Sequence, residues 1–157
     1  MLYFIKEKFF IDHSHFSKML DPGNTVKQSH RTYISIKVIV NNNIFYLPLR
    51  KNLGADIRPY GRIGHSVPSA SKPNAGIDYR YALIVNDNSY LEKCLIVKLP
   101  NSQIRTIYAD YNDICQEFEK YLEGYIKTVL KNRLKHEPLY RESCLVNFND
   151  ELGLSNT

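Results

Sequence analysis

The feature that most constrains the fold is a pair of strand-like segments separated by three asparagines. Residues 32–40 form a run rich in β-branched side chains whose alternation is typical of a strand. The asparagines at 41–43 tolerate the positive φ of a tight turn, and the apolar residues 44–49 return. Pro48 cannot donate to a strand ladder, so it marks an edge, a bulge or the end of a strand. The sequence therefore predicts an antiparallel hairpin.

The rest of the chain combines shorter strand-like segments with one long amphipathic helix. Apolar residues recur at helical spacing from about residue 110 to 135, with acidic residues first and basic residues last, as the helix dipole favours. The other predictions are strands at residues 2–11, 80–85, 94–99, 103–108 and 144–148, and a short helix at residues 12–20. A chain of 157 residues with this pattern is expected to form a single α+β domain, residues 1–157.

Charge and cysteine content narrow the class of protein. The formal net charge of +5 and the pI near 9.0 favour an anionic partner. The three cysteines are widely spaced and form no C-x-x-C pair, so the sequence signals neither a zinc site nor a disulfide framework. No stretch approaches 18 uncharged apolar residues, so we expect no membrane span and a cytoplasmic location.

The stretch from Arg50 to Tyr81 concentrates the positive charge. It contains six lysines and arginines against two aspartates, and four of the seven glycines. We interpret it as a long loop between two core strands, and loops of this length inside a domain are usually functional or disordered. Its basic side chains, turn-forming residues and tyrosines favour binding of an anionic polymer, and RNA is the polymer that fits best. The alternative is a solvated, partly disordered insertion.

The residue types in this stretch suffice to cleave RNA without a metal ion or another cofactor. RNA carries its own nucleophile, the 2′-hydroxyl, so the enzyme must supply a base, an acid and cations that stabilise the phosphorane. The His13-x-His15 pair has no specified third ligand, so we expect no metal and no cofactor. Of the five histidines, only His65 lies in the basic stretch, and it is the first candidate for the acid or base.

The remaining candidates are cations, a serine and tyrosines. Arg50 and Lys51 follow the end of a predicted strand and could clamp a phosphate. Ser66 could donate to phosphate or support a turn, Arg80 could contact RNA or pair with a neighbouring aspartate, and Arg31 could face the site or be solvated. The predicted catalytic set is His65, Arg50, Lys51, Ser66 and Arg31, and the predicted RNA-binding set is Arg58, Arg62, Lys72, Arg80, Tyr60 and Tyr79.

In the order of its segments, the chain resembles the toxins of type III toxin–antitoxin systems, the ToxN/AbiQ/CptN/TenpN group of endoribonucleases. The likeness lies in residues 31–40, 45–49 and 75–85, followed by the long helix and residues 144–148. The resemblance implies a compact, twisted, antiparallel β-barrel-like core of the MazF/Kid kind, with the long C-terminal helix and short peripheral helices packed around it.

The resemblance also implies an activity and partners. A toxin of this group cuts mRNA, and processes its own repeat antitoxin RNA, through attack of the 2′-hydroxyl to give a 2′,3′-cyclic phosphate. The implied partners are the mRNA substrate and a small structured antitoxin RNA, which inhibits the toxin within a closed toxin–RNA assembly, and the implied role is phage defence by abortive infection. In the ToxN branch a Thr-Ser-x-Lys stretch follows the Pro-Leu pair. Here Arg50-Lys51-Asn52 stands there, so that serine is not carried over, whereas Arg31 has a basic counterpart in the family.

Two other classes of protein also fit the sequence. A non-catalytic RNA-binding protein would use the same basic stretch, residues 50–80, to hold its ligand. A protein-interaction β-module is the third alternative. Neither of these classes would cut RNA.

Overall fold

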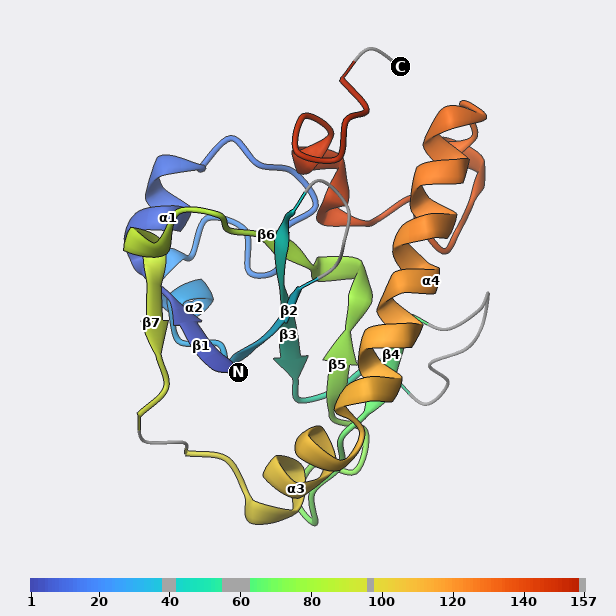
Figure 1. Cartoon of the computed structure of the whole chain (residues 1–157). Coiled ribbons are helices and arrows are strands. Elements are labelled where there is room, and N and C mark those ends of the chain that lie inside the picture. Colours follow the sequence, from blue (N-terminus) through green and yellow to red (C-terminus); the bar gives the residue numbers. More distant parts are fainter. Residues whose placement is uncertain (38–41, 55–62, 96–97, 156–157) are drawn as a thin grey trace.

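The computed structural model describes residues 1–37, 42–54, 63–95 and 98–155, in which seven strands form one sheet with helices packed around it (Figure 1). The strands are β1 (Leu2–Ile5), β2 (Tyr33–Lys37), β3 (Ile44–Arg50), β4 (Gly64–Ser66), β5 (Gly76–Asp78), β6 (Leu83–Ile84) and β7 (Leu91–Lys93). The α-helices are α1 (Glu7–Asp12), α2 (Thr25–Ser29), α3 (Asn101–Ala109) and α4 (Tyr111–Leu130). Four 3₁₀ turns join them: η1 (Tyr79–Tyr81), η2 (Asn88–Tyr90), η3 (Leu134–His136) and η4 (Cys144–Phe148).

The central strand of the sheet is β3, which has neighbours along both edges. Strand β2 pairs antiparallel with β3 along one edge, as the predicted hairpin requires. The other edge is shared, because β6 pairs with Phe45 and Tyr46 whereas β5 pairs with Leu49 and Arg50. The strand order is β4-β5-β3-β2-β1-β7, and β6 lies beside β5 against β3. In the described residues β4 and β7 form the two ends of this order, so the sheet is open there and the expected barrel closure is not observed.

Strands β5 and β6 are two halves of one strand that η1 interrupts. Asp78 begins the interruption, because its carboxylate accepts a hydrogen bond from the backbone N–H of Arg80 at 3.1 Å. Pro48 of β3 lies level with this interruption, between the residues that pair with β5 and those that pair with β6. The backbone N–H of Leu49 donates to Thr32 on the β2 side, so the nitrogen of Pro48 faces η1. Proline has no N–H to donate, and it therefore lies where the pairing is interrupted.

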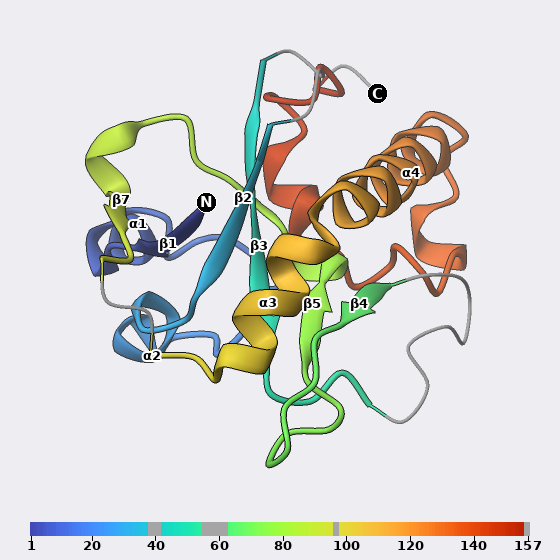
Figure 2. The same cartoon turned by 60° about the horizontal axis from the view of Figure 1, so that its bottom comes forward.

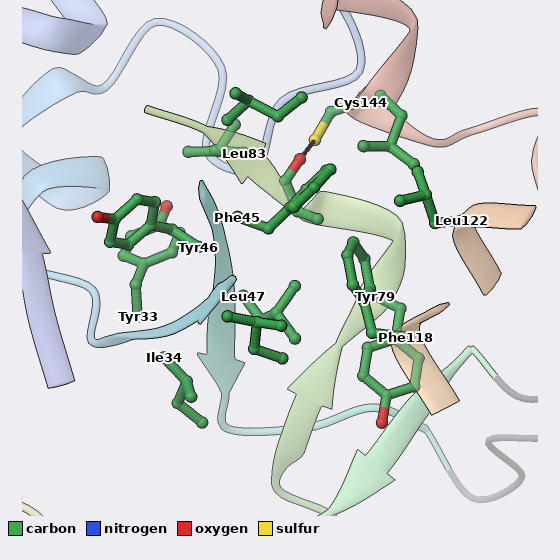
Figure 3. Packing of buried hydrophobic residues seen from close by; sticks show 14 of the residues in the cluster. Tyr33, Ile34, Phe45, Tyr46, Leu47, Tyr79, Leu83, Phe118, Leu122 and Cys144 are labelled. Carbon is green, nitrogen blue, oxygen red and sulfur yellow. Dashed lines mark hydrogen bonds between the residues drawn. The ribbon is translucent and has the colours of Figure 1, made fainter. Parts of the chain in front are cut away.

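The core covers both faces of the sheet, and on one of them aromatic rings of the sheet and of α4 meet (Figure 3). Phe118 of α4 packs against Phe45 with ring centroids 5.0 Å apart and against Tyr79 at 5.9 Å. The buried positions of α4 recur at the predicted helical spacing: Ile114, Phe118, Tyr121, Leu122 and Tyr125. Burying each such side chain contributes roughly 1.5–3 kcal/mol, and this burial holds α4 on the sheet.

The α+β class, the long helix and the pairing of the two hairpin strands are confirmed, and residues 38–41 of the predicted hairpin lie outside the described residues. Helix α4 ends before the predicted residue 135 because Asn132 has a φ of 56°, a left-handed conformation that ends a helix. The predicted strand at 103–108 is wrong, since these residues lie in α3, where Gln103 and Ile107, four positions apart, are buried on one face. The predicted strand at 144–148 is also wrong, because Ser143 caps a 3₁₀ turn there by accepting from the backbone N–H of Leu145.

The N-terminal predictions are shifted along the chain. The first strand ends at Ile5, and the following residues form α1, which buries Phe9 and Phe10. The helix predicted at 12–20 is wrong, because this segment contains Lys18 at a φ of 59°. The strand predicted at 80–85 is confirmed only at Leu83–Ile84, which form β6, because Arg80 and Tyr81 belong to η1. The strand predicted at 94–99 is wrong in its described residues, because the strand that pairs with β1 is β7, which ends at Lys93. Residues 96–97 lie outside the described part of the chain.

Candidate functional site

The basic stretch contains a β-hairpin where one long loop was predicted. Strands β4 and β5 pair through Gly64↔Asp78, His65↔Ile77 and Ser66↔Gly76, and β5 extends the sheet from β3. The loop prediction is wrong because two of its glycines are strand residues at a close approach of backbones. A Cβ atom on Gly64 would collide with the carbonyl oxygen of Ile77, and one on Gly76 would collide with that of His65. Figure 2 shows this hairpin beside α4.

The ring of His65 lies between two carboxylates. Its Nδ1 is 3.0 Å from Oε1 and 3.2 Å from Oε2 of Glu117, and its Nε2 is 2.9 Å from Oδ2 of Asp110. Asp110 is the residue that joins α3 to α4, and Glu117 lies about two helical turns further along α4, on the same side. The side chains of His65, Glu117 and Asp110 are 13%, 20% and 38% exposed. The more exposed carboxylate therefore faces Nε2.

Tyr79 extends this chain of hydrogen bonds into the core. Its hydroxyl donates to Oε1 of Glu117 at 2.8 Å, so Glu117 is held by Tyr79 as well as by His65. The predicted contact between the Tyr79 ring and RNA does not fit the structure. The residue is fully buried against Phe118, so no face of its ring is open to a base.

The positions of Glu117 and Asp110 determine which ring nitrogens of His65 must carry a proton for both hydrogen bonds to form. A neutral imidazole donates from one nitrogen and accepts at the other, whereas an imidazolium donates from both. With both carboxylates ionised, the hydrogen bonds to Glu117 and Asp110 are satisfied together only by the imidazolium. In the neutral form, a proton on Nδ1 keeps the bond to Glu117 and leaves a lone pair on Nε2. The site is therefore built to hold a titratable ring in a fixed orientation.

Two of the predicted arginines share one buried carboxylate. Arg80 donates to Asp78 through Nε at 3.0 Å and Nη2 at 2.8 Å, and Arg50 donates to it through Nη1 at 2.9 Å. Asp78 is fully buried, and its hydrogen bonds raise the pKa of Arg80 above its usual value. Both guanidinium groups also lie over the ring of Tyr81, 5.3 and 5.4 Å from its centroid. The predicted structural pairing of Arg80 with a neighbouring aspartate is thus observed.

The sheet separates this arginine pair from His65. Arg50, Gly76 and Ser66 are aligned across β3, β5 and β4, and His65 is aligned with Ile77 in the next row. Side chains of successive rows point to opposite faces of a sheet. Arg50 and Ser66 therefore point to one face of the sheet, and His65 points to the other. The structure therefore does not bring the predicted catalytic set together on one surface.

Arg31 is engaged in a structural contact. Its Nη2 lies 2.6 Å from Oδ2 of Asp21, and its Nη1 donates to the carbonyl oxygen of Leu49 at 3.4 Å. Burial raises the pKa of Asp21, but the hydrogen bonds from Arg31 and Lys27 outweigh it and lower this pKa below its usual value. Of its predicted alternatives, solvation does not fit, since the side chain is only 16% exposed.

The other predicted residues divide into two groups. Lys51, Ser66 and Lys72 are exposed and accessible to a ligand. Arg58, Tyr60 and Arg62 lie outside the described residues, so their contacts with RNA stay predictions.

The sequence analysis did not identify Asp110 and Glu117. Both were attributed to the acidic first half of the long helix, and their spacing of seven residues is the signal that they share one helix side. Across the described ranges, no three His, Cys, Asp or Glu side chains are arranged to hold a metal ion.

Comparison with protein-family models, curated proteins and solved structures found no match to this chain. Among the helices of the described ranges, none combines the length and the apolar character needed to cross a bilayer.

Proposed function

We propose that this chain is a metal-independent endoribonuclease, the toxin of a type III toxin–antitoxin system, and that His65 transfers the proton in the cleavage step. The observation that carries the proposal is the orientation of His65 between Glu117 and Asp110. The antiparallel sheet with α4 packed on it supports an antiparallel α+β core of the expected class, with the sheet open at β4 and β7 in the described residues. The net charge of +5 supports the proposed partners, an mRNA substrate and an inhibitory antitoxin RNA in a closed assembly in the cytoplasm.

In the proposed reaction, neutral His65 keeps its Nδ1–H on Glu117, and RNA displaces Asp110 from Nε2. The free Nε2 takes the proton of the 2′-hydroxyl. The 2′ oxygen then bonds to phosphorus as the bond from phosphorus to the 5′ oxygen breaks. The 5′ oxygen gains a proton from water, and the hydroxide that forms takes up the proton held by His65, so the products are a 2′,3′-cyclic phosphate and a 5′-hydroxyl. Glu117 stabilises the imidazolium that forms, as a carboxylate does in a Ser-His-Asp triad.

The reaction is tested with purified protein freed of RNA. We expect single-stranded RNA to be cut in excess EDTA, with 5′-hydroxyl and 2′,3′-cyclic phosphate ends, because every group in the proposed step belongs to protein, RNA or solvent water. End-group analysis of the fragments checks the chemistry. Loss of cleavage in EDTA with recovery in magnesium would contradict the proposal.

Glu117→Gln tests the role of the carboxylate on Nδ1. The amide keeps the size of the side chain but cannot stabilise an imidazolium, so we expect kcat to fall at least about 10-fold, with KM and the thermal unfolding temperature little changed. The matched control is Glu119→Gln, an exposed residue of the same helix, which should cleave at the wild-type rate. Equal rates for the two variants would exclude Glu117 from the reaction.

A second candidate function is RNA binding without catalysis. It is favoured by the observation that both ring nitrogens of His65 already contact carboxylates, in which case the histidine ties β4 to α4. Under this candidate, RNA binds through phosphate contacts, its affinity falls steeply with salt, and no fragments appear in the cleavage assay.

A further inference from the structure

A cleft that the proposed reaction does not use lies where β1, β3 and β7 meet the first turn of α4. Its volume is about 540 Å³, within the range of about 300–1,000 Å³ that small-molecule sites occupy. Three tyrosines from different elements line it: Tyr3 of β1, Tyr46 of β3 and Tyr111 of α4. Tyr46 is buried at 2% exposure, and Tyr3 and Tyr111 are half-buried.

The tyrosine rings have fixed positions before any ligand binds. Tyr3 and Tyr46 meet edge to face, with ring centroids 5.7 Å apart and planes at 89°. Tyr111 is fixed from the other side, because its hydroxyl donates to the backbone carbonyl of Ser35 at 2.8 Å. Rings that are already ordered lose little conformational entropy when a ligand binds.

The polar groups of the cleft complement a nucleotide. Burial raises the pKa of Tyr46 and of Tyr111 to about 12, so both hydroxyls are neutral near pH 7. Asn88 adds a side-chain amide that can donate and accept, and Lys93 adds an exposed positive charge. Aromatic faces, hydrogen-bonding groups and a single cation match a base, its polar edge and a phosphate.

The cleft is also connected to His65 through two consecutive residues. Asp110 contacts the imidazole, and Tyr111, the next residue, lines the cleft. On β3, Tyr46 alternates with Leu47 and Leu49, so Tyr46 and the paired Tyr3 lie on the face of the sheet opposite to His65. The cleft and His65 are therefore linked through the start of α4.

We propose that this cleft binds a nucleobase of single-stranded RNA, with the base stacked on Tyr3 and its phosphate at Lys93. The proposal rests on the proposed function for the identity of the ligand. It makes the cleft a specificity site, because the cleft favours RNA that carries the preferred base.

The test uses the full chain and the four nucleoside 5′-monophosphates, titrated by NMR. We expect amide shifts at the cleft residues and tighter binding of one base than of the others. Tyr3→Leu, which removes the aromatic face and keeps the apolar volume, should weaken this binding about 5- to 150-fold. The matched variant Tyr3→Phe keeps the ring and should bind as the wild type does. A Lys93→Ala variant should weaken the monophosphate but leave the nucleoside unchanged.

Two results would overturn the proposal. One is the absence of cleft shifts at millimolar nucleotide, and the other is equal affinity in Tyr3→Leu and Tyr3→Phe. Neither result decides whether the chain cleaves RNA, because the cleavage assay tests the proposed function separately. If the cleft binds nucleotides and no RNA is cut, the nuclease proposal fails and the cleft proposal stands.

Discussion

His65→Ala is expected to lower the rate of RNA cleavage by about 100- to 10,000-fold, the usual cost of losing a general acid or base. The reason is that His65 is the titratable ring held between Glu117 and Asp110, with its more open nitrogen on the Asp110 side. The measurement is single-turnover cleavage of a labelled RNA by purified protein, together with toxicity when the variant is expressed alone. We expect the variant to be non-toxic and still to bind antitoxin RNA.

The control for this prediction is His136→Ala. His136 is exposed and lies in η3, away from β4 and from the carboxylates, so its removal should leave cleavage unchanged. Circular dichroism and a thermal unfolding curve show whether His65→Ala keeps its fold. A folded His65→Ala variant that cleaves near the wild-type rate would exclude His65 from proton transfer.

Asp78→Ala is expected to have the largest effect on stability, with a loss of about 3–5 kcal/mol in the free energy of unfolding. The substitution leaves Arg50 and Arg80 side by side, largely buried, without the carboxylate that both contact. It also removes the acceptor that begins η1, where the strand between β5 and β6 is interrupted. Urea unfolding followed by circular dichroism measures the loss.

Two further variants identify the cause of this loss. Asp113→Ala removes an exposed aspartate from the first turn of α4 and should change stability by less than about 0.5–1 kcal/mol. Arg50→Met in the Asp78→Ala background removes one of the two unpaired charges and should recover part of the stability. A loss below about 1 kcal/mol in Asp78→Ala would show that the two arginines do not depend on the buried carboxylate.

Local patterns predicted the hairpin and α4 because their evidence lies within a few residues. The β-branched run at residues 33–37 and the helical spacing from Ile114 to Tyr125 can each be recognised without knowing the rest of the fold. Residues 103–108 were misassigned because the burial of Gln103 and Ile107 on one helix face is set by the rest of the fold. Gly64 and Gly76 were taken as loop signals, although they serve a close approach of strands.

The sequence predicted only part of the candidate site, because local patterns do not show which distant segments come together. His65 was selected from its local surroundings, but its contacts with Asp110 and Glu117 span 45 and 52 residues of sequence. No pattern near His65 indicates which helix packs over β4. The separation of Arg50 from His65 depends on the pairing of each strand with β5, and a change of one residue in either register would put both on one face.

The adjacency of Asp110 and Tyr111 links the two places that they serve. Under our proposal, a base in the cleft contacts Tyr111, which is held on Ser35, and Asp110 beside it contacts Nε2 of His65. If occupancy of the cleft favours release of Asp110 from the imidazole, then release of Asp110 must favour occupancy by the same factor. The joint between α3 and α4 would then act as a reciprocal switch, in which RNA of the preferred sequence uncovers the histidine that cuts it.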